Sequence, residues 1–241
     1  PFSITGQPNA MGGREVGGLA NMLAAHMNIE DQSHQQLVQE FWQSPTICTK
    51  AGAKAIDLFD KINAGEIKAV WIMATNPLVS LPNRNVIEQA LKKCDFVVVS
   101  DCMEKNDTLT YADVKLPATT WGEKDGTVTN SERRISRQTG LMPAPGQAKH
   151  DWQIIRDVAH KMGFASHFDY HHAADIFKEH AALSGYKNGS HGHAVRDFDI
   201  SGLSTLSLNE YNRLIPVQWP INSTYPNGRQ HIFDDGLFST P

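Results

Sequence analysis

The sequence predicts an α/β fold with a parallel sheet and a loop-rich C-terminal extension. Two apolar runs carry this prediction, 67–77 (IKAVWIMATNP) and 95–101 (DFVVVSD), and a helix-like segment, 83–94, lies between them. A strand, a helix and a strand within about thirty residues form a crossover unit whose two strands are parallel. Both runs are apolar throughout, as expected for strands buried on both faces. A third short strand is expected at 111–118.

Helical periodicity accounts for most of the chain before this unit. A glycine-rich loop over 5–18 precedes a predicted helix at 15–27, whose apolar residues recur close to every 3.6 positions. A polar helix follows at 29–45 and is ended by Pro45. The helix at 51–65 places Ile56, Phe59 and Ile62 on one face and is followed by Gly65 as its C-cap.

The second half of the chain is predicted to be less regular. Extended segments are expected within 126–137, and an amphipathic helix at 151–163 is opened by Asp151 as N-cap and closed by Gly163. Beyond 165 the His-, Gly- and Ser-containing stretches predict mainly loop. We therefore expect two domains, an α/β domain at 1–164, which the resemblance described below implies to be dinucleotide-binding, and a loop-rich extension at 165–241.

Composition limits the classes of function. The 241 residues are 40% hydrophobic and 20% charged, with a net charge of −4, which disfavours a general nucleic-acid binder. No apolar run approaches the ~20 residues of a membrane span. Three cysteines without CxxC spacing favour a reducing compartment over a disulfide framework. The chain begins with Pro, and we expect it to be an internal fragment of a longer polypeptide.

The ends of the two predicted strands carry the first candidate site. Asn76 follows the first strand, and Ser100 and Asp101 end the second. Ligands of parallel α/β sheets bind beyond the carboxyl ends of the strands. An aspartate there can accept hydrogen bonds from ribose hydroxyls or from the N–H edge of guanine. Helix capping and turn formation are the alternative, and the absence of G-x-G-x-x-G weighs against an NAD site.

Two charged or titratable groups have competing interpretations. A cluster of acidic and basic residues could grip phosphate through its Arg and Lys side chains, or could be an ordinary solvated surface, which we favour. It comprises Glu123, Lys124, Glu132, Arg133, Arg134 and Arg137. The histidines of the second half could bind a metal, but no cysteine or carboxylate pattern completes a zinc site, and solvated loops are favoured. They are His167, His171, His172, His180, His191 and His193.

The glycine-rich opening loop has one embedded charge pair, Arg14 and Glu15. Glycines on both sides would let the backbone approach a ligand closely while the Arg14 guanidinium binds an oxyanion. In the alternative, the loop is a helix N-terminus where Glu15 favours the helix dipole and Arg14 is a surface residue. The residues alone leave the two interpretations about even.

Five stretches, in this order, resemble the molybdopterin oxidoreductase family, and most of all its assimilatory nitrate reductase branch. They are PFSITGQPNAMGGREVGG (1–18), ATNPLVSLPN (74–83), VVVSD (97–101), YADVKLPATTWGEKDGTVTNSERRISR (111–137) and PGQAKHDW (145–152). The resemblance runs from Pro1 to about Gly163 and continues weakly through 199–204 and 218–220. Each stretch alone is a weak signal, whereas their combination is specific.

The resemblance implies a cofactor, a substrate and site residues. The family binds a pair of molybdopterin guanine dinucleotides without the glycine fingerprint, and this region corresponds to a Rossmann-like domain that holds one of them. Residues expected to contact the dinucleotide are Asn76, Ser100, Asp101, Lys124 and Asp151. Residues expected to line the molybdenum and the route of nitrate are Thr5, Gln7 and Arg14. The implied reaction reduces nitrate to nitrite by oxygen-atom transfer.

The resemblance also implies parts that this chain does not carry. The family's [4Fe-4S] cysteine cluster, its molybdenum-ligating cysteine and its second pterin-binding domain are absent, so the isolated chain is expected to be inactive. The implied partner is an electron donor such as ferredoxin, flavodoxin or an NADH-dependent reductase subunit, and the implied location is the cytoplasm. The rival interpretations are a formate dehydrogenase or other molybdopterin reductase, and a non-catalytic α/β nucleotide-binding module.

Overall fold

A computed structural model describes residues 8–233 and 236 of the chain. The chain divides into two compact units, and each is assembled from separate stretches of sequence. The first unit takes the residues up to 51, 126–138 and those from 170 onward; the second takes 52–125 and 139–169. The domain boundary expected at residue 164 separates a cofactor-binding part from an extension, and it stays a prediction. No helix in the described part of the chain combines the length and apolar composition needed to cross a membrane.

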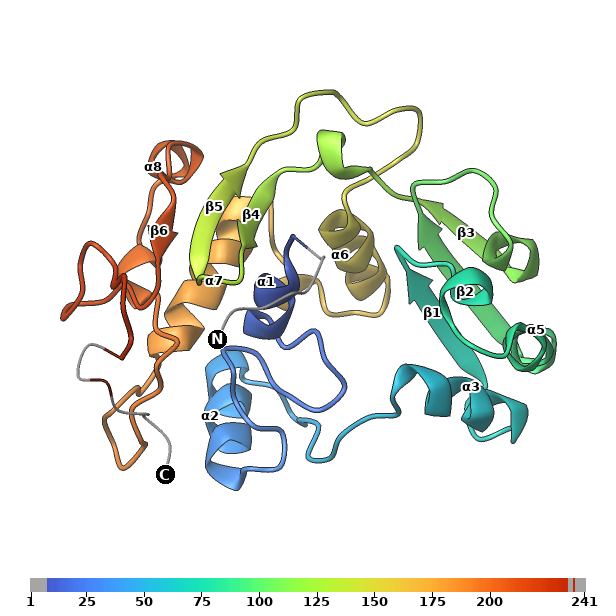
Figure 1. Ribbon diagram of the computed structural model, residues 1–241, viewed down its shortest axis with the longest axis horizontal. Coiled ribbons are helices and arrows are strands. Elements are labelled where there is room, and N and C mark those ends of the chain that lie inside the picture. The colour runs from blue at the N-terminus through green and yellow to red at the C-terminus, as the bar shows by residue number, and fades with distance from the viewer. Residues whose placement is uncertain (1–7, 234–235, 237–241) are drawn as a thin grey trace. The chain divides into compact units, whose positions relative to one another are not determined.

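The second unit is built on a parallel sheet of three strands in the order β1-β2-β3 (Figure 1). Val70 pairs with Val97, and Val98 pairs with Val114. Its helices and strands are α3 (Ala55–Asn63), β1 (Ala69–Met73), α4 (Pro77–Ser80), α5 (Arg84–Lys93), β2 (Phe96–Asp101), β3 (Val114–Pro117) and α6 (Asp151–Lys161). The predicted parallel crossover unit and the third strand are confirmed.

The core of the second unit lies on one side of this sheet. Val97 and Val99 of β2 pack with Phe59 and Ile62 of α3, in a cluster that α5 completes. On the other face of β2, Phe96 is 46% exposed and Val98 is half-buried, whereas Ser100 is fully buried, so this face is only partly covered among the described residues. Ile56 is likewise exposed, because α3 buries a narrower face than its periodicity predicts.

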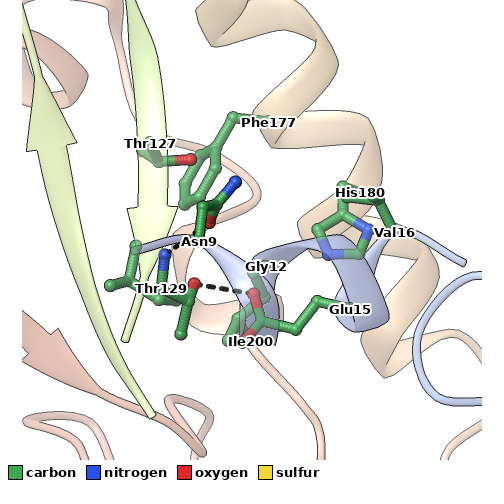
Figure 2. A pocket seen from close by; sticks show the side chains of 10 residues that line it. Asn9, Gly12, Glu15, Val16, Thr127, Thr129, Phe177, His180 and Ile200 are labelled. Carbon is green, nitrogen blue, oxygen red and sulfur yellow. Dashed lines mark hydrogen bonds between the residues drawn. The ribbon is translucent and has the colours of Figure 1, made fainter. Parts of the chain in front are cut away.

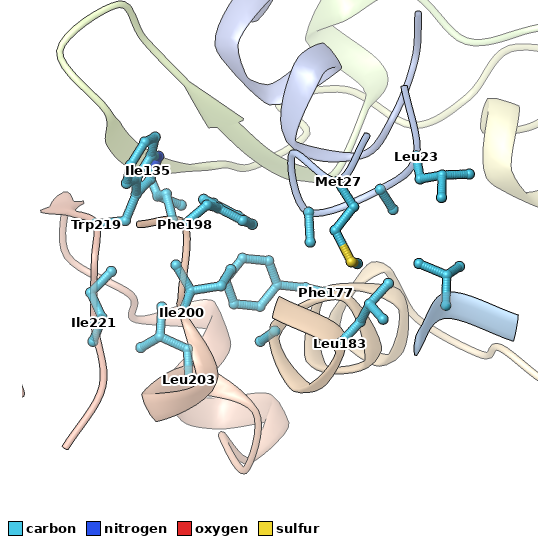
Figure 3. Packing of buried hydrophobic residues seen from close by; sticks show 14 of the residues in the cluster. Leu23, Met27, Ile135, Phe177, Leu183, Phe198, Ile200, Leu203, Trp219 and Ile221 are labelled. Atoms are coloured by element: carbon cyan, nitrogen blue, oxygen red, sulfur yellow. The ribbon is translucent and has the colours of Figure 1, made fainter. Parts of the chain in front are cut away.

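The first unit combines a small antiparallel sheet with helices and a well-filled core (Figure 3). Its sheet has the order β4-β5-β6, and Thr127 pairs with Arg137. Its helices and strands are α1 (Ala10–Glu15), α2 (Gln32–Trp42), β4 (Gly126–Thr129), β5 (Arg134–Gln138), α7 (Ala173–Gly185), α8 (Leu208–Asn212) and β6 (Val217–Gln218). Phe177 of α7, Phe198 and Trp219 lie at the centre of the packing shown in Figure 3.

The start of the chain differs from the sequence prediction. The helix lies within the glycine-rich stretch as α1, whereas 16–30 forms turns closed by an isolated bridge between Met22 and Asn28. Ala25 and His26 adopt positive φ angles, which a helix does not permit, and the Ala25 amide donates to the Glu15 carbonyl. Burial of these turn residues therefore outweighs their helical periodicity.

Two further elements depart from expectation. Helix α7 and its buried core residues lie in the segment for which we predicted mainly loop. At α6, His150 is the N-cap and Asp151 is the first helical residue, so the helix begins one position earlier than predicted. The Asp151 carboxylate thus stays at the positive end of the helix, where the dipole favours it.

Candidate functional site

A groove in the second unit lies at the carboxyl ends of β2 and β3. It has a volume of about 360 Å³, and Asp101, the last residue of β2, forms part of its wall. The other lining residues are Cys102, Met103, Glu104, Leu109, Lys115, Leu116, Pro117, Ala118, Thr120, Glu123, Pro145, Gln147 and Ala148. This is the edge at which open parallel sheets bind ligands.

Asp101 is held in place by the turn that follows β2. Its Oδ1 accepts from the Met103 amide at 2.9 Å, and its Oδ2 accepts from Asn106 Nδ2 at 2.8 Å. A carboxylate offers about four acceptor directions, so both oxygens keep capacity for a ligand donor. The turn therefore fixes the orientation of Asp101 without using up its ability to bind.

Two chain segments run side by side to form the opposite wall of the groove. The Lys149 amide donates to the Pro117 carbonyl at 3.1 Å, and the Thr119 amide donates to the Lys149 carbonyl at 3.0 Å. Thr119 Oγ1 also lies 3.2 Å from Nδ1 of His150, the N-cap of α6. The groove wall and the start of α6 are thereby linked.

Lys124 and Asp151 form an ion pair close to this wall. Lys124 Nζ lies 2.5 Å from Asp151 Oδ2, and both side chains are about 30% exposed. Asp151 Oδ1 is buried and has no hydrogen-bond partner in the described part of the chain. An unpaired buried carboxylate oxygen is costly, and a ligand N–H or O–H would satisfy it. This unpaired oxygen, in the same unit as the groove, fits a bound polar cofactor.

Asn76 and Ser100 lie at the strand ends, as predicted, but they are not equally accessible. Asn76 Oδ1 accepts from Thr108 Oγ1 at 2.6 Å, and its amide nitrogen keeps its donors. Ser100 is fully buried, and its Oγ accepts from Trp71 Nε1 at 2.7 Å. Its hydroxyl therefore stabilises the sheet, and any ligand contact would need local movement.

Arg14 and Glu15 occupy α1 in the first unit. Arg14 is exposed, whereas Glu15 is only 4% exposed and is the last residue of the helix. The alternative that Glu15 serves the dipole at a helix N-terminus is therefore wrong. Thr5 and Gln7 lie outside the described residues, so their predicted roles stay predictions.

The glycines around this pair have different explanations. Gly17 has φ +74°, and a Cβ there would lie 2.6 Å from the Ala24 amide nitrogen, so packing within the chain accounts for it. A Cβ on Gly13 would meet nothing within 4 Å. Gly13 is thus the glycine whose missing side chain this unit does not explain, which leaves room for the predicted close approach of a ligand.

Two arginines of the charged cluster are engaged in contacts within the first unit. The Arg133 guanidinium donates to the backbone carbonyls of Trp219 and Gln230 and stacks on the Trp219 ring at 5.1 Å. Arg137 donates to the Gly126 carbonyl and lies 4.4 Å from the Tyr211 ring centroid. These arginines, which we expected to be solvated, join distant segments of the first unit.

The histidines do not form a metal site. Among residues 8–233 and 236, no group of three or more His, Cys, Asp or Glu side chains is arranged to hold a metal ion. His172 is the N-cap of α7, and His180 packs against Phe198 with ring centroids 5.4 Å apart. These contacts place His172 at the start of α7 and the His180 ring against the core of the first unit.

Sequence reasoning missed a buried polar group. Thr129 donates to the Glu15 carboxylate (Figure 2), and Trp219 also donates to it. No feature of the local sequence around residue 15 indicates these contacts. Sequence reasoning also did not predict that Glu123 and Gln147 line the same groove. They line the same groove because the segments 117–120 and 147–150 are joined by backbone hydrogen bonds, and these bonds cannot be inferred from the sequence.

Comparisons with known proteins identify the family. Residues 6–161 match the family model described as molybdopterin oxidoreductase. A nitrate reductase of Klebsiella oxytoca is 52% identical over 222 residues, which cover 92% of this chain and 25% of that protein. The F420-dependent formate dehydrogenase subunit alpha of Methanocaldococcus jannaschii is 38% identical over 230 residues, covering 95% of this chain and 33% of that subunit.

A solved structure supports the fold. Acetylene hydratase from Pelobacter acetylenicus superposes with a TM-score of 0.51 at 22% identity, over 69% of this chain and 21% of that chain. The chain spans a quarter to a third of the length of the two relatives above. The match to the family model covers more than half of the chain, and the chain belongs to the molybdopterin oxidoreductase family.

Proposed function

We propose that this chain is the central part of a molybdenum nitrate reductase, which reduces nitrate to nitrite. The observation that carries the proposal is the 52% identity to a nitrate reductase over nearly the whole chain. The overall reaction takes nitrate, two protons and two electrons to nitrite and water. Because the chain spans about a quarter of that relative, the activity is proposed for the full-length protein.

We assign the groove of the second unit to a molybdopterin guanine dinucleotide, one of a pair. The parallel sheet would act as a Rossmann-like platform, with Asp101 accepting from the N–H edge of guanine. Lys124 would contact phosphate, and Asp151 Oδ1 would accept from the bound group. Asn76 Nδ2 would donate to it, while Ser100 would contribute by fixing the strand end. When bound, the cofactor supplies the metal that exchanges electrons and oxygen with the substrate.

Residues 1–164 form the proposed dinucleotide-binding domain in this assignment, and 165–241 the extension. The same reasoning gives the full-length protein a [4Fe-4S] cluster and an electron donor such as ferredoxin, flavodoxin or an NADH-dependent reductase subunit. A cytoplasmic location follows from the assimilatory branch that the sequence resembles.

Arg14 is the residue proposed to bind nitrate. Its guanidinium is exposed, and no hydrogen bond or ion pair within the described residues occupies it. An unpaired guanidinium can bind a planar oxyanion in a bidentate manner, which orients the anion as well as attracting it. Thr5 and Gln7 would line the same route.

The formate dehydrogenase relative supports a second candidate function. At 38% identity over 95% of the chain, the fold and the cofactor assignment would hold for either enzyme. Nitrate reduction and formate oxidation run in opposite redox directions, so the two functions separate cleanly by assay.

The test uses the full-length protein with an artificial electron donor or acceptor. We expect nitrate to be reduced, and Arg14→Ala to raise the KM for nitrate about tenfold or more, as loss of a charge-assisted contact predicts. Arg213→Ala, which removes another exposed arginine of the same unit, is the matched control and should leave the KM unchanged. Turnover of formate without turnover of nitrate would refute the proposed function.

A further inference from the structure

The first unit contains a cavity between α1, β4 and α7, shown in Figure 2, which lies outside the groove assigned to the cofactor. Its volume is about 90 Å³. Glu15 and His180 line it, together with Asn9, Gly12, Val16, Thr127, Thr129, Ile135, Phe177 and Ile200. At roughly 30 Å³ for each molecule, the space suffices for about three waters.

Glu15 is a buried carboxyl group whose hydrogen-bond partners within 8–233 and 236 are neutral. Its Oε2 accepts from Thr129 Oγ1 at 2.8 Å, and its Oε1 accepts from Trp219 Nε1 at 2.6 Å. No cation lies within ion-pair distance of it in the described part of the chain. Burial raises the pKa of the Glu15 carboxyl to about 6, although the two hydrogen bonds act in the opposite direction.

His180 presents an unsatisfied nitrogen on the opposite wall. Its Nε2 is buried and has no hydrogen-bond partner among the described residues. In Figure 2 its ring faces α1. Burial, with a smaller contribution from His26, lowers the pKa of His180 to about 4, so the ring is neutral at physiological pH. The Nε2 atom of a neutral imidazole either donates a hydrogen bond to water as N–H or accepts one as the bare nitrogen, depending on the tautomer.

The surroundings contain few other charges. Arg14 lies on α1 beside Glu15, His26 stacks on Phe198 at 5.1 Å, and Arg133 stacks on Trp219. Burial first, and Arg14 second, lower the pKa of His26. The side chains that β4 contributes to the cavity, Thr127 and Thr129, are neutral. Gain or loss of a proton at Glu15 is therefore the main change of charge that this cavity permits.

We propose that the cavity binds water molecules that connect Glu15 to His180, and that the assembly takes up and releases one proton. In the uptake step, a proton from the solvent reaches a cavity water as hydronium, which transfers the proton to a Glu15 oxygen and is left as water. In release, the carboxyl O–H breaks and a cavity water carries the proton away as hydronium. The carboxylate left behind keeps its bonds from Thr129 and Trp219. An apolar ligand would leave His180 Nε2 unpaired, and an anion would be repelled by Glu15.

This inference is independent of nitrate as the substrate. The cavity is present whenever the first unit is folded, whatever the substrate is. The inference can therefore be wrong while the proposed function is right, and the proposed function can be wrong while the inference is right. The measurements therefore use water density and a vibrational band instead of turnover.

The first measurement is a high-resolution crystal structure of the unmodified full-length protein. We expect ordered water within hydrogen-bond distance of both His180 Nε2 and a Glu15 oxygen. A dry cavity, or one filled by a side chain, would overturn the proposal without any variant being made.

The second measurement is an infrared titration of the same protein. We expect a C=O band of a buried protonated carboxyl that disappears as the pH rises through about 6. Glu15→Gln should abolish the band: its amide oxygen can accept from Trp219, and its amide nitrogen can donate to the Thr129 hydroxyl, so the fold is preserved. Glu30→Gln, at an exposed carboxyl, is the control and should leave the band unchanged. Persistence of the band in Glu15→Gln overturns the assignment.

Discussion

Burial of Glu15 makes the stability of the first unit depend on pH in a direction opposite to that of most carboxyl groups. The folded protein raises the pKa of this carboxyl from 4.5 to about 6, so the folded state holds the proton more strongly than the unfolded state does. Stability from this group is fully present below the unfolded pKa of 4.5 and is lost as the pH rises through about 6. A shift of about 1.5 units corresponds to about 2 kcal/mol.

The perturbation that isolates this effect is Glu15→Gln. The variant cannot ionise at residue 15, so it should lack the loss of about 2 kcal/mol that the unmodified protein undergoes between about pH 4 and pH 8. Urea denaturation followed by near-ultraviolet circular dichroism gives the free energy of unfolding of both proteins at both pH values. The change in this free energy between the two pH values is then compared between the unmodified protein and the variant. Titration of other groups, the histidines included, cancels in that comparison.

Two outcomes would refute the reasoning. If both proteins show the same pH dependence, Glu15 has an ordinary pKa and its burial does not penalise the charge. If Glu15→Gln instead steepens the loss of stability with rising pH, the carboxylate is the favoured form and the sign is wrong. Glu30→Gln serves as the control, because an exposed carboxyl should leave the pH dependence unchanged.

Three further predictions address the groove, the core and the glycine-rich helix. In Asp101→Asn, the side chain cannot accept hydrogen bonds from two adjacent N–H groups, so we expect the affinity for the dinucleotide to fall about tenfold or more. The measurement is the cofactor content of the purified protein, and Asp60→Asn, at an exposed site, should not change it. Phe198→Ala, at a 1% exposed position, should cost about 3–5 kcal/mol of unfolding free energy, whereas Val195→Ala, at 78% exposure, should cost almost nothing. Gly13→Ala should stabilise α1 by up to about 1 kcal/mol, because the added Cβ meets open space. If turnover is lost although stability increases, a ligand approaches the backbone closely at Gly13. Unchanged turnover would contradict this close approach.

The second unit could be predicted from sequence because its contacts are local. The strands β1 and β2 and the helix α5 between them follow one another within 69–101, and their apolar patterns match their final pairing. The edge that carries Asp101 follows from that topology alone. The opposite wall could not be foreseen, because it depends on hydrogen bonds between Thr119 and Lys149, thirty residues apart.

The first unit resisted prediction because distant residues determine its local structure. Glu15 ends α1 and is buried by its partners Thr129 and Trp219. The helical periodicity of 15–27 therefore does not determine the local structure of that segment. Arg133 and Arg137 resemble surface charges in sequence, yet each caps carbonyls of another segment. Helix α7 was obscured by its histidine-rich surroundings.

The bond between Glu15 and Trp219 joins positions 204 residues apart, and it has a consequence for biosynthesis. At roughly 5–20 residues per second, the ribosome delivers Trp219 about 10–40 seconds after Glu15. Throughout that interval α1 lacks the side chain that covers its carboxyl group, whereas the sheet-forming stretch 69–117 is complete about halfway through it. The second unit can therefore fold during translation, and the first must wait for its C-terminal strand. Cells that make this protein must protect the waiting segment, and truncated transcripts that stop before Trp219 should yield chains recognised by quality control.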